Sequence, residues 1–144
     1  MKILLINGVN LNFVGIREKS IYGDKNFESM CDSINEYATD KGVEISFFQS
    51  NSEGEIVDAI QRAYLEKYDG IIINPGAHTH YSLAIYDAIK SVSLPCVEVH
   101  LSNVHAREDF RKNCVTTGAC IGQICGFGEK SYMLAIDAIS EYIK

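Results

Sequence analysis

Short runs of consecutive apolar residues alternate along the chain with stretches whose apolar residues recur every three or four positions. The first run, residues 3–6, is apolar throughout and stops before Gly8, as a strand buried on both faces does. From residue 27 to residue 38 the apolar positions follow helical spacing, and Gly42 supplies a C-terminal stop. The chain therefore begins with a strand, a long connection and a helix.

The same alternation continues to the C-terminus. Four further strands are expected at 43–48, 70–73, 95–99 and within 119–125, and helices are expected after a Ser52–Glu55 capping box, over 81–90 and after Gly128. Strands that alternate with amphipathic helices predict a parallel sheet covered on both faces, and right-handed crossovers restrict its topology. We therefore predict an α/β fold: a single-domain, flavodoxin-like, doubly wound five-stranded parallel sheet.

Composition narrows the possible partners. The 144 residues include 13 Lys and Arg against 19 Asp and Glu, for a formal charge of −6. An acidic balance argues against a general nucleic-acid binder and against docking on anionic membranes. The five cysteines show no C-x-x-C spacing, and the first apolar run is too short for a signal peptide or a membrane span. We expect free thiols and a cytoplasmic protein.

In doubly wound sheets, ligands bind at the carboxyl ends of the strands. After the first strand, residues 8–26 form a Gly- and Asn-rich stretch without periodicity. A loop of this length inside a compact domain is usually functional and often a lid. We predict one catalytic domain over residues 1–144, with an active-site lid at about 17–25.

All four histidines, His78, His80, His100 and His105, follow the third and fourth expected strands. Zinc sites need three or four converging ligands. No cysteine looks placed to help, and Glu98 is expected to point away from His100. We therefore expect no metal.

Two other chemistries of this fold class lack their residues. A phosphoryl-accepting receiver domain needs aspartates at the first and third strand ends, where Asn7 and Asn74 stand. A P-loop needs glycine before Lys130, and the chain has Glu129 there.

The remaining candidates combine a base, an acid and anion-binding groups without a cofactor motif. They are Arg17, Tyr22, His80, Glu98, His100, Ser102, Arg111 and several asparagines. Such a set suits proton abstraction beside a carbonyl, with loss of a leaving group, from a small anionic substrate.

At these residues the sequence resembles a known family, the type II 3-dehydroquinate dehydratases, over nearly its whole length. The motifs are Ile6-Asn7-Gly8-Val9-Asn10-Leu11-Asn12, Arg17-Glu18 with Ile21-Tyr22-Gly23, Phe48-Gln49-Ser50-Asn51, Ile73-Asn74-Pro75-Gly76-Ala77 with Thr79-His80, and residues 98–108 with Phe110-Arg111. Residues 112–117 differ from the family's usual His-Ser-Tyr-type stretch.

The resemblance implies dehydration of 3-dehydroquinate to 3-dehydroshikimate, the third step of the shikimate pathway, by anti elimination through an enolate and without cofactor or metal. It implies that Tyr22 is the base, with Arg17 favouring its phenolate. His100 is then the acid that protonates the departing hydroxyl, with Glu98 supporting it. Asn10 helps to hold a water beside the enolate.

The resemblance also implies a substrate site and an assembly. Asn74, His80 and Arg111 bind substrate hydroxyls, while Ser102 and the backbone at Leu101 take the carboxylate. Asp87 reaches a neighbouring subunit's site, because the family assembles as a dodecamer, a tetramer of trimers.

Two other functions stay open on the residues alone. A non-catalytic module that binds small anions would explain Arg111, Ser102 and the asparagines but gives His100 no role. A metal-dependent hydrolase would use the histidines.

Overall fold

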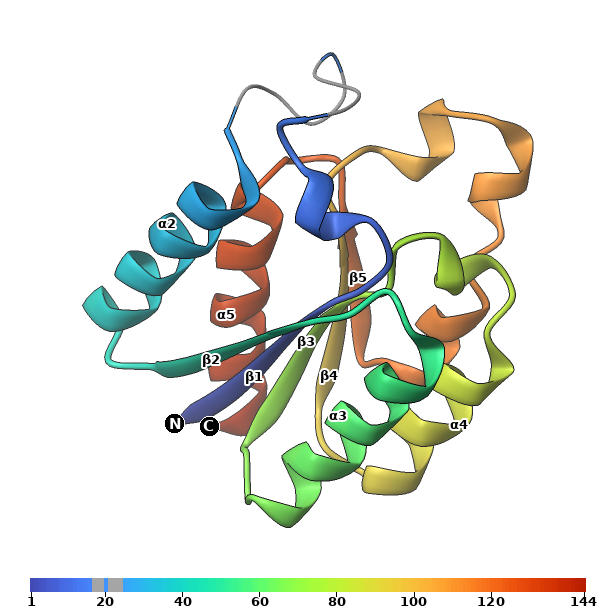
Figure 1. The fold of residues 1–144 in the computed structure, drawn as a ribbon. Coiled ribbons are helices and arrows are strands. Elements are labelled where there is room, and N and C mark those ends of the chain that lie inside the picture. Colours follow the sequence, from blue (N-terminus) through green and yellow to red (C-terminus); the bar gives the residue numbers. More distant parts are fainter. Residues whose placement is uncertain (17–19, 21–24) are drawn as a thin grey trace.

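The computed structural model describes residues 1–16, 20 and 25–144, and its core is a parallel sheet. The strands are β1 (Lys2–Asn7), β2 (Glu44–Gln49), β3 (Gly70–Asn74), β4 (Cys96–His100) and β5 (Gly122–Cys125). Their order is β2-β1-β3-β4-β5, with every neighbouring pair parallel (Figure 1). This is the flavodoxin-like order, so the predicted fold class is confirmed.

Helices cover both faces of the sheet. α2 (Phe27–Asp40) and α5 (Lys130–Ile143) lie on one face, and α3 (Glu53–Leu65) and α4 (Leu83–Val92) on the other (Figure 1). Successive strand side chains point to opposite faces. Ile3 and Leu5 therefore pack with α2 and α5, whereas Leu4 and Ile6 pack with α3 and α4. A strand that is apolar at every position follows from this double burial.

The helix starts are set by polar caps. The side chains of Asn26, Ser52 and Ser82 each accept a backbone N–H in the first turn of α2, α3 and α4. The capping box is only half formed, because the Glu55 carboxylate accepts a hydrogen bond from Ser50 instead of from the Ser52 backbone. α4 begins two residues later than predicted, since Ser82 is its cap.

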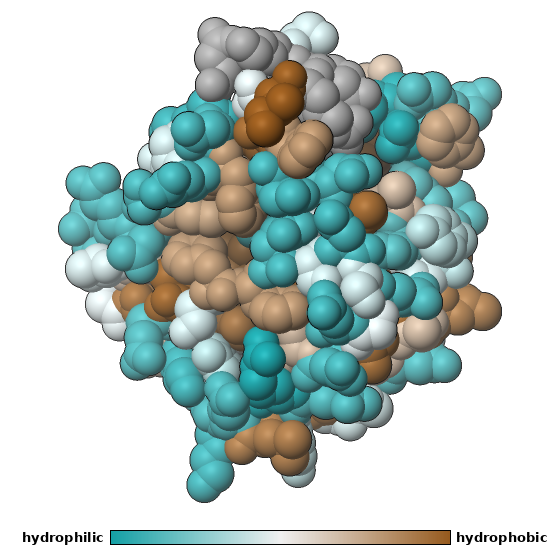
Figure 2. Space-filling view, viewed as in Figure 1, coloured by the Kyte–Doolittle hydropathy of each residue, from teal (hydrophilic) through white to brown (hydrophobic). Residues whose placement is uncertain are grey.

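The β2 edge of the sheet and the carboxyl ends of its strands differ in what covers them. On the β2 side, apolar side chains reach the surface, and Phe47 is exposed by 36% (Figure 2). The carboxyl ends of the strands are instead covered by short 3-10 turns, among them η1 (Leu11–Phe13), η2 (Gly76–His80) and η5 (Val115–Ala119). Among the described residues, no helix has the length and apolar content needed to cross a bilayer.

Candidate active site

A cavity of about 150 Å³ opens at the carboxyl ends of β1, β3 and β4. It has the size of a small polar metabolite, well below the 300–1,000 Å³ usual for drug-sized ligands. Its described lining combines apolar residues with amides, imidazoles and guanidinium groups: Val9, Asn10, Leu11, Phe13, Val14, Asn74, Gly76, Ala77, His80, His100, Leu101, Ser102, Val104, Arg107 and Arg111. The lining comes from strand ends, where the fold predicts a ligand site.

Most of the predicted site residues meet at this cavity. Those that line it are Asn10, Asn74, His80, His100, Leu101, Ser102 and Arg111. Glu98 lies behind His100 and does not line it. Asp87 is exposed on α4, away from this cavity. Arg17, Tyr22 and most of the predicted lid lie outside the described residues.

His100 and Glu98 form a buried pair at the cavity wall. Nε2 of His100 lies 3.2 Å from Oε2 of Glu98, and the two side chains are 8% and 0% exposed. Although the distance is short, Nε2 has no aligned hydrogen-bond acceptor among the described residues, so the contact is an ion pair only when the imidazole is protonated. The expectation that Glu98 points away from His100 was wrong. Residues two apart in a strand share a face, so Glu98 and His100 lie on the α3/α4 face with Cys96.

Glu98 is surrounded by hydrogen-bond donors. Its Oε1 accepts from Thr116 and lies 3.2 Å from the Thr79 hydroxyl, and its Oε2 accepts from Thr117 and, at 2.8 Å, from Nε2 of Gln123. Burial raises the pKa of Glu98, but the nearby His100 imidazole and the hydroxyls of Thr116 and Thr117 outweigh it and lower that pKa to about 2. An ionised carboxylate therefore lies behind His100 at the wall of the cavity.

The floor of the cavity is a second polar network, and it carries no charge. The Tyr132 hydroxyl donates to Oδ1 of Asn7 at 2.6 Å and accepts from Nδ2 of Asn74 at 2.8 Å. Oδ1 of Asn74 also accepts from the Gly76 backbone at 3.2 Å. Tyr132 is fully buried on α5, so the helix ties the ends of β1 and β3 together beneath the cavity.

Two cationic side chains, Arg107 and Arg111, also line the cavity. Nη1 of Arg107 donates to the Ser102 hydroxyl at 3.3 Å. Arg111 pairs with Glu108, with 2.5 Å between Nε and Oε2, and its side chain is 23% exposed. Two guanidinium groups and a hydroxyl that line one cavity suit a carboxylate ligand. Sequence reasoning missed Arg107 as a site residue, although it lies in the motif that follows β4 and its charge was the available signal.

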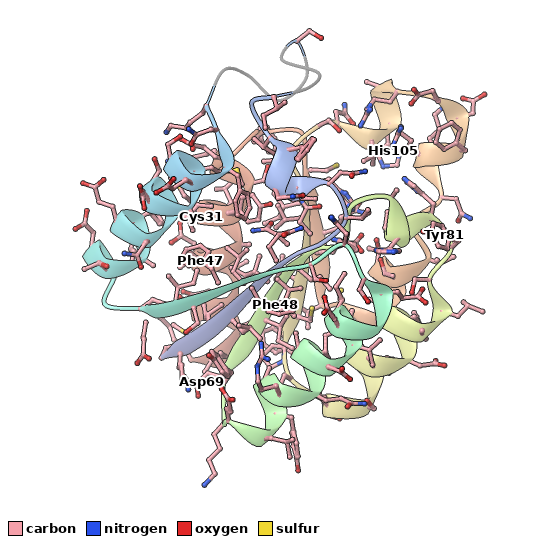
Figure 3. All side chains as sticks on the ribbon, in the orientation of Figure 1. Cys31, Phe47, Phe48, Asp69, Tyr81 and His105 are labelled. Carbon is pink, nitrogen blue, oxygen red and sulfur yellow. The ribbon has the colours of Figure 1, made fainter. Side chains whose placement is uncertain are left out.

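The four histidines do not converge. His80 donates from Nδ1 to the Asn113 carbonyl at 2.7 Å and lines the cavity. His78 is buried against Tyr81, and His105 is exposed on the segment after β4 (Figure 3). The histidine motif therefore supplies two cavity residues, His80 and His100, rather than a set of metal ligands.

One group of metal-ligating types does come together. Ligand atoms of Glu98, His100 and Cys114 lie within 4.8 Å of one another, so the expectation that no cysteine is near was wrong. Burial raises the pKa of the Cys114 thiol, which disfavours the thiolate that a metal binds. The Glu98 oxygens also already accept hydrogen bonds from threonine and glutamine side chains. The donor set thus favours an acid with its carboxylate partner over a metal centre.

Known proteins match this chain along nearly all of its length. The family model for dehydroquinase class II matches residues 1–140. The chain belongs to this family. A Clostridium beijerinckii protein named 3-dehydroquinate dehydratase is 66% identical over 139 residues, which cover 96% of this chain and 95% of that protein.

Solved type II dehydroquinase structures share the fold. The crystal structure of the enzyme from Butyrivibrio crossotus has a TM-score of 0.96 at 57% identity and covers 97% of each chain. That of the Propionibacterium acnes enzyme has a TM-score of 0.93 at 36% identity, covering 97% of this chain and 96% of that one. Membership in the class II dehydroquinases confirms the predicted enzyme class, a hydro-lyase of the dehydratase type.

Proposed function

We propose that this chain catalyses the anti elimination of water from 3-dehydroquinate, through an enolate, to give 3-dehydroshikimate, the third step of the shikimate pathway. The name of the Clostridium beijerinckii relative supports the substrate. The observation that carries the proposal is the His100–Glu98 pair at the cavity wall, because it is an acid backed by a buried carboxylate. Residues 1–144 are the catalytic domain, and about 17–25 are its lid.

His100 acts as the general acid in this proposal. The carboxylate of Glu98 engages one ring nitrogen, which leaves the other for the departing hydroxyl at C1. Protonation of that hydroxyl releases water as the enolate collapses to the conjugated enone. A negative partner favours the imidazolium form that carries this proton.

Tyr22 is the proposed base and removes the proton from C2. A free tyrosine has a pKa of about 10, and lowering it to about 7 needs roughly 4 kcal/mol of preference for the phenolate. One guanidinium at about 4 Å supplies roughly 4 kcal/mol at an effective dielectric near 20. Arg17 is the residue we assign to that role, because arginine stays protonated beside a basic partner. Asn10 helps to hold the water that stabilises the enolate.

The remaining cavity residues bind the substrate. Ser102 and the backbone of Leu101 take its carboxylate, while Asn74, His80 and Arg111 bind its hydroxyls. The half-buried guanidinium of Arg111 and the small size of the cavity support an anionic, sugar-like ligand. No cofactor or metal has a step in this proposal.

Asp87 is proposed to complete a neighbouring subunit's site within a cytoplasmic dodecamer, a tetramer of trimers. It is exposed on α4, on the same outward side as Leu83, which is 66% exposed. An exposed carboxylate beside an exposed large apolar residue suits a subunit contact.

An absorbance assay tests the function, because the product is a conjugated enone and the substrate is not. We expect purified protein to produce the enone and to keep its rate in the presence of chelator. Tyr22→Phe should lower kcat by several orders of magnitude while substrate still binds. Tyr64→Phe, a loss of hydroxyl on the exposed side of α3, is the matched control.

Three outcomes would contradict the proposal. A protein that leaves 3-dehydroquinate unchanged lacks the function. Near-normal turnover by Tyr22→Phe removes Tyr22 from the mechanism. Activity lost on chelation favours the metal-dependent alternative.

A further inference from the structure

Four side chains without an assigned role surround the carboxylate of Glu98. Thr79 lies in η2, Thr116 and Thr117 in η5, and Gln123 in β5. None of the four is among the described residues that line the cavity. We name this set, Thr79, Thr116, Thr117 and Gln123, the carboxylate cage.

The hydrogen bonds of the cage can be assigned proton by proton. A threonine hydroxyl has one proton and an ionised carboxylate has none. Thr116 donates its proton to Oε1 of Glu98, so the 2.7 Å contact between Thr79 and Thr116 has Thr79 as its donor. The proton of Thr79 therefore supports Thr116, and that of Thr116 supports the carboxylate.

The other carboxylate oxygen of Glu98, Oε2, also accepts hydrogen bonds from the cage. Thr117 donates to Oε2, and Gln123 donates one amide proton to Oε2 at 2.8 Å and the other to the Thr117 hydroxyl at 3.0 Å. Every assigned proton of the cage thus points toward the carboxylate, directly or through one hydroxyl. A protonated Glu98 would have to displace one of these donors, so the cage favours the ionised form.

The ionised form determines which proton His100 can release. With a carboxylate 3.2 Å from Nε2, that nitrogen carries its proton, because two facing lone pairs would repel. Nδ1 then holds a transferable proton only when the ring is an imidazolium. A fixed negative charge beside the ring favours that state.

We propose that Thr116, Thr117 and Gln123 are positioning residues for the leaving-group acid, and that they act by fixing the Glu98 carboxylate that orients the His100 ring. This proposal rests on the proposed function, in which His100 is the acid. Thr79 supports Thr116 and also lies 3.2 Å from Oε1 of Glu98. The cage touches neither substrate nor reacting atoms.

Other titratable and charged groups lie near the His100–Glu98 pair. The thiols of Cys96, Cys114 and Cys120 lie on β4 and on the segment packed against it, and Cys125 ends β5. The pKa values of Cys96 and Cys114 are raised, so these thiols stay neutral at the working pH. The cavity side presents Arg107, Arg111 and His80.

The main test replaces Thr117 by valine, which keeps the shape and removes the hydroxyl. We expect kcat to fall about 10-fold with KM within 2-fold, because Thr117 does not line the cavity. Glu98 stays ionised in this variant and, with one donor fewer, attracts the facing ring proton more strongly, so the alkaline limb of the pH–rate profile should move to higher pH. Thr117→Ser should restore both values.

Two further variants separate positioning from general loss of structure. Gln123→Leu should give the same pattern as Thr117→Val and serves if that variant does not fold. Thr39→Val is the matched control, because its hydroxyl donates to the Asn35 carbonyl within α2 and Thr39 is not among the described residues that line the cavity. It should leave kcat and the profile unchanged.

A double-mutant cycle tests whether Thr117 acts through Glu98. In a Glu98→Gln background, Thr117→Val should change kcat by less than 2-fold, because the charge it serves is gone. An equal loss in both backgrounds, or unchanged kcat and pH profile in the single variants, would overturn the proposal. Serine as damaging as valine at position 117 would also overturn it.

An NMR titration of the Glu98 side-chain carboxyl carbon needs no substrate. Its midpoint should rise by at least one unit in Thr117→Val and not in Thr39→Val. An unchanged midpoint overturns the proposal. A parent protein that leaves 3-dehydroquinate unchanged overturns the proposed function instead, so the two failures are distinguishable.

Discussion

The floor and the wall of the cavity are both buried polar networks, but only the wall carries charge. The floor joins Asn7, Tyr132 and Asn74, three neutral side chains bonded at 2.6 and 2.8 Å. The wall surrounds the Glu98 carboxylate with hydroxyls and an amide and faces it with His100. The two networks lie at neighbouring strand ends of one sheet.

The difference between the neutral floor and the charged wall shows that the strand ends of one sheet can hold two polar networks with different roles. A neutral network fixes shape, and its contribution does not depend on pH between the titrations of carboxylates and thiols. A charged network can bias a proton equilibrium, but it requires donors on every side to be stable when buried. We therefore expect changes to the floor to affect stability and changes to the wall to affect catalysis and pH response.

The largest expected effect is at the wall. His100→Ala should lower kcat about 10²–10⁴-fold, because the departing hydroxyl loses its proton donor. Single-turnover absorbance measurements check this, with His105→Ala as the control, since His105 is exposed and does not line the cavity. A loss smaller than 10-fold in a folded His100→Ala protein would exclude His100 as the acid.

The charge of the wall should also appear in acid stability. The pKa of Glu98 is lowered from 4.5 to about 2 in the folded protein. A lowered pKa gives stability that is complete above the unfolded value and is lost as pH falls through the folded one. The difference between parent and Glu98→Gln should thus shrink by about 3 kcal/mol between pH 5 and pH 2, at 1.36 kcal/mol per unit.

Urea unfolding across this pH range measures that difference. Glu141→Gln is the control, because Glu141 is an exposed carboxylate paired with Lys144. A constant difference between parent and Glu98→Gln from pH 5 to pH 2 would show that the pKa of Glu98 is not lowered.

The smallest effect is expected at the floor. Tyr132→Phe removes one hydroxyl and leaves the Asn7 and Asn74 amides without it, which should reduce the free energy of unfolding by about 1–3 kcal/mol. The loss should be equal at pH 5 and pH 8. Urea unfolding at both values checks it, beside Tyr142→Phe on the exposed side of α5. A loss of unfolding free energy that differs between pH 5 and pH 8 would contradict the expectation that the floor, unlike the wall, stabilises the protein independently of pH.

The sequence predicted the sheet well because strand and helix patterns are local. Ile3 to Ile6 and Ile71 to Ile73 are apolar at every position since both faces of their strands are covered. Ser52 and Ser82 are local signals too, yet the Ser52–Glu55 box formed only in part because Ser50 competed for the Glu55 carboxylate. Element ends depend on such competing partners, which a spacing rule does not include.

The site was predicted less completely. Strand ends and the family resemblance indicated His100 and Ser102, which line the cavity, but Arg107 was missed although it lies in the motif after β4. The orientation of Glu98 was wrong although strand periodicity alone settles it. The roles of Thr116 and Gln123 could not be predicted from the sequence. Both residues lie far from Glu98 along the chain, and only the path of η5 and β5 brings their side chains to its carboxylate.

By itself, the order of apolar and polar positions determined that this chain folds into a layered parallel sheet, since burial on one or two faces leaves a period that can be read residue by residue. Only the tertiary structure decided which protons meet the Glu98 carboxylate, because those contacts join β4, η5 and β5 through the crossover connections of the sheet. The local pattern of apolar positions determines the layered sheet, and three-dimensional packing determines the contacts of the Glu98 carboxylate.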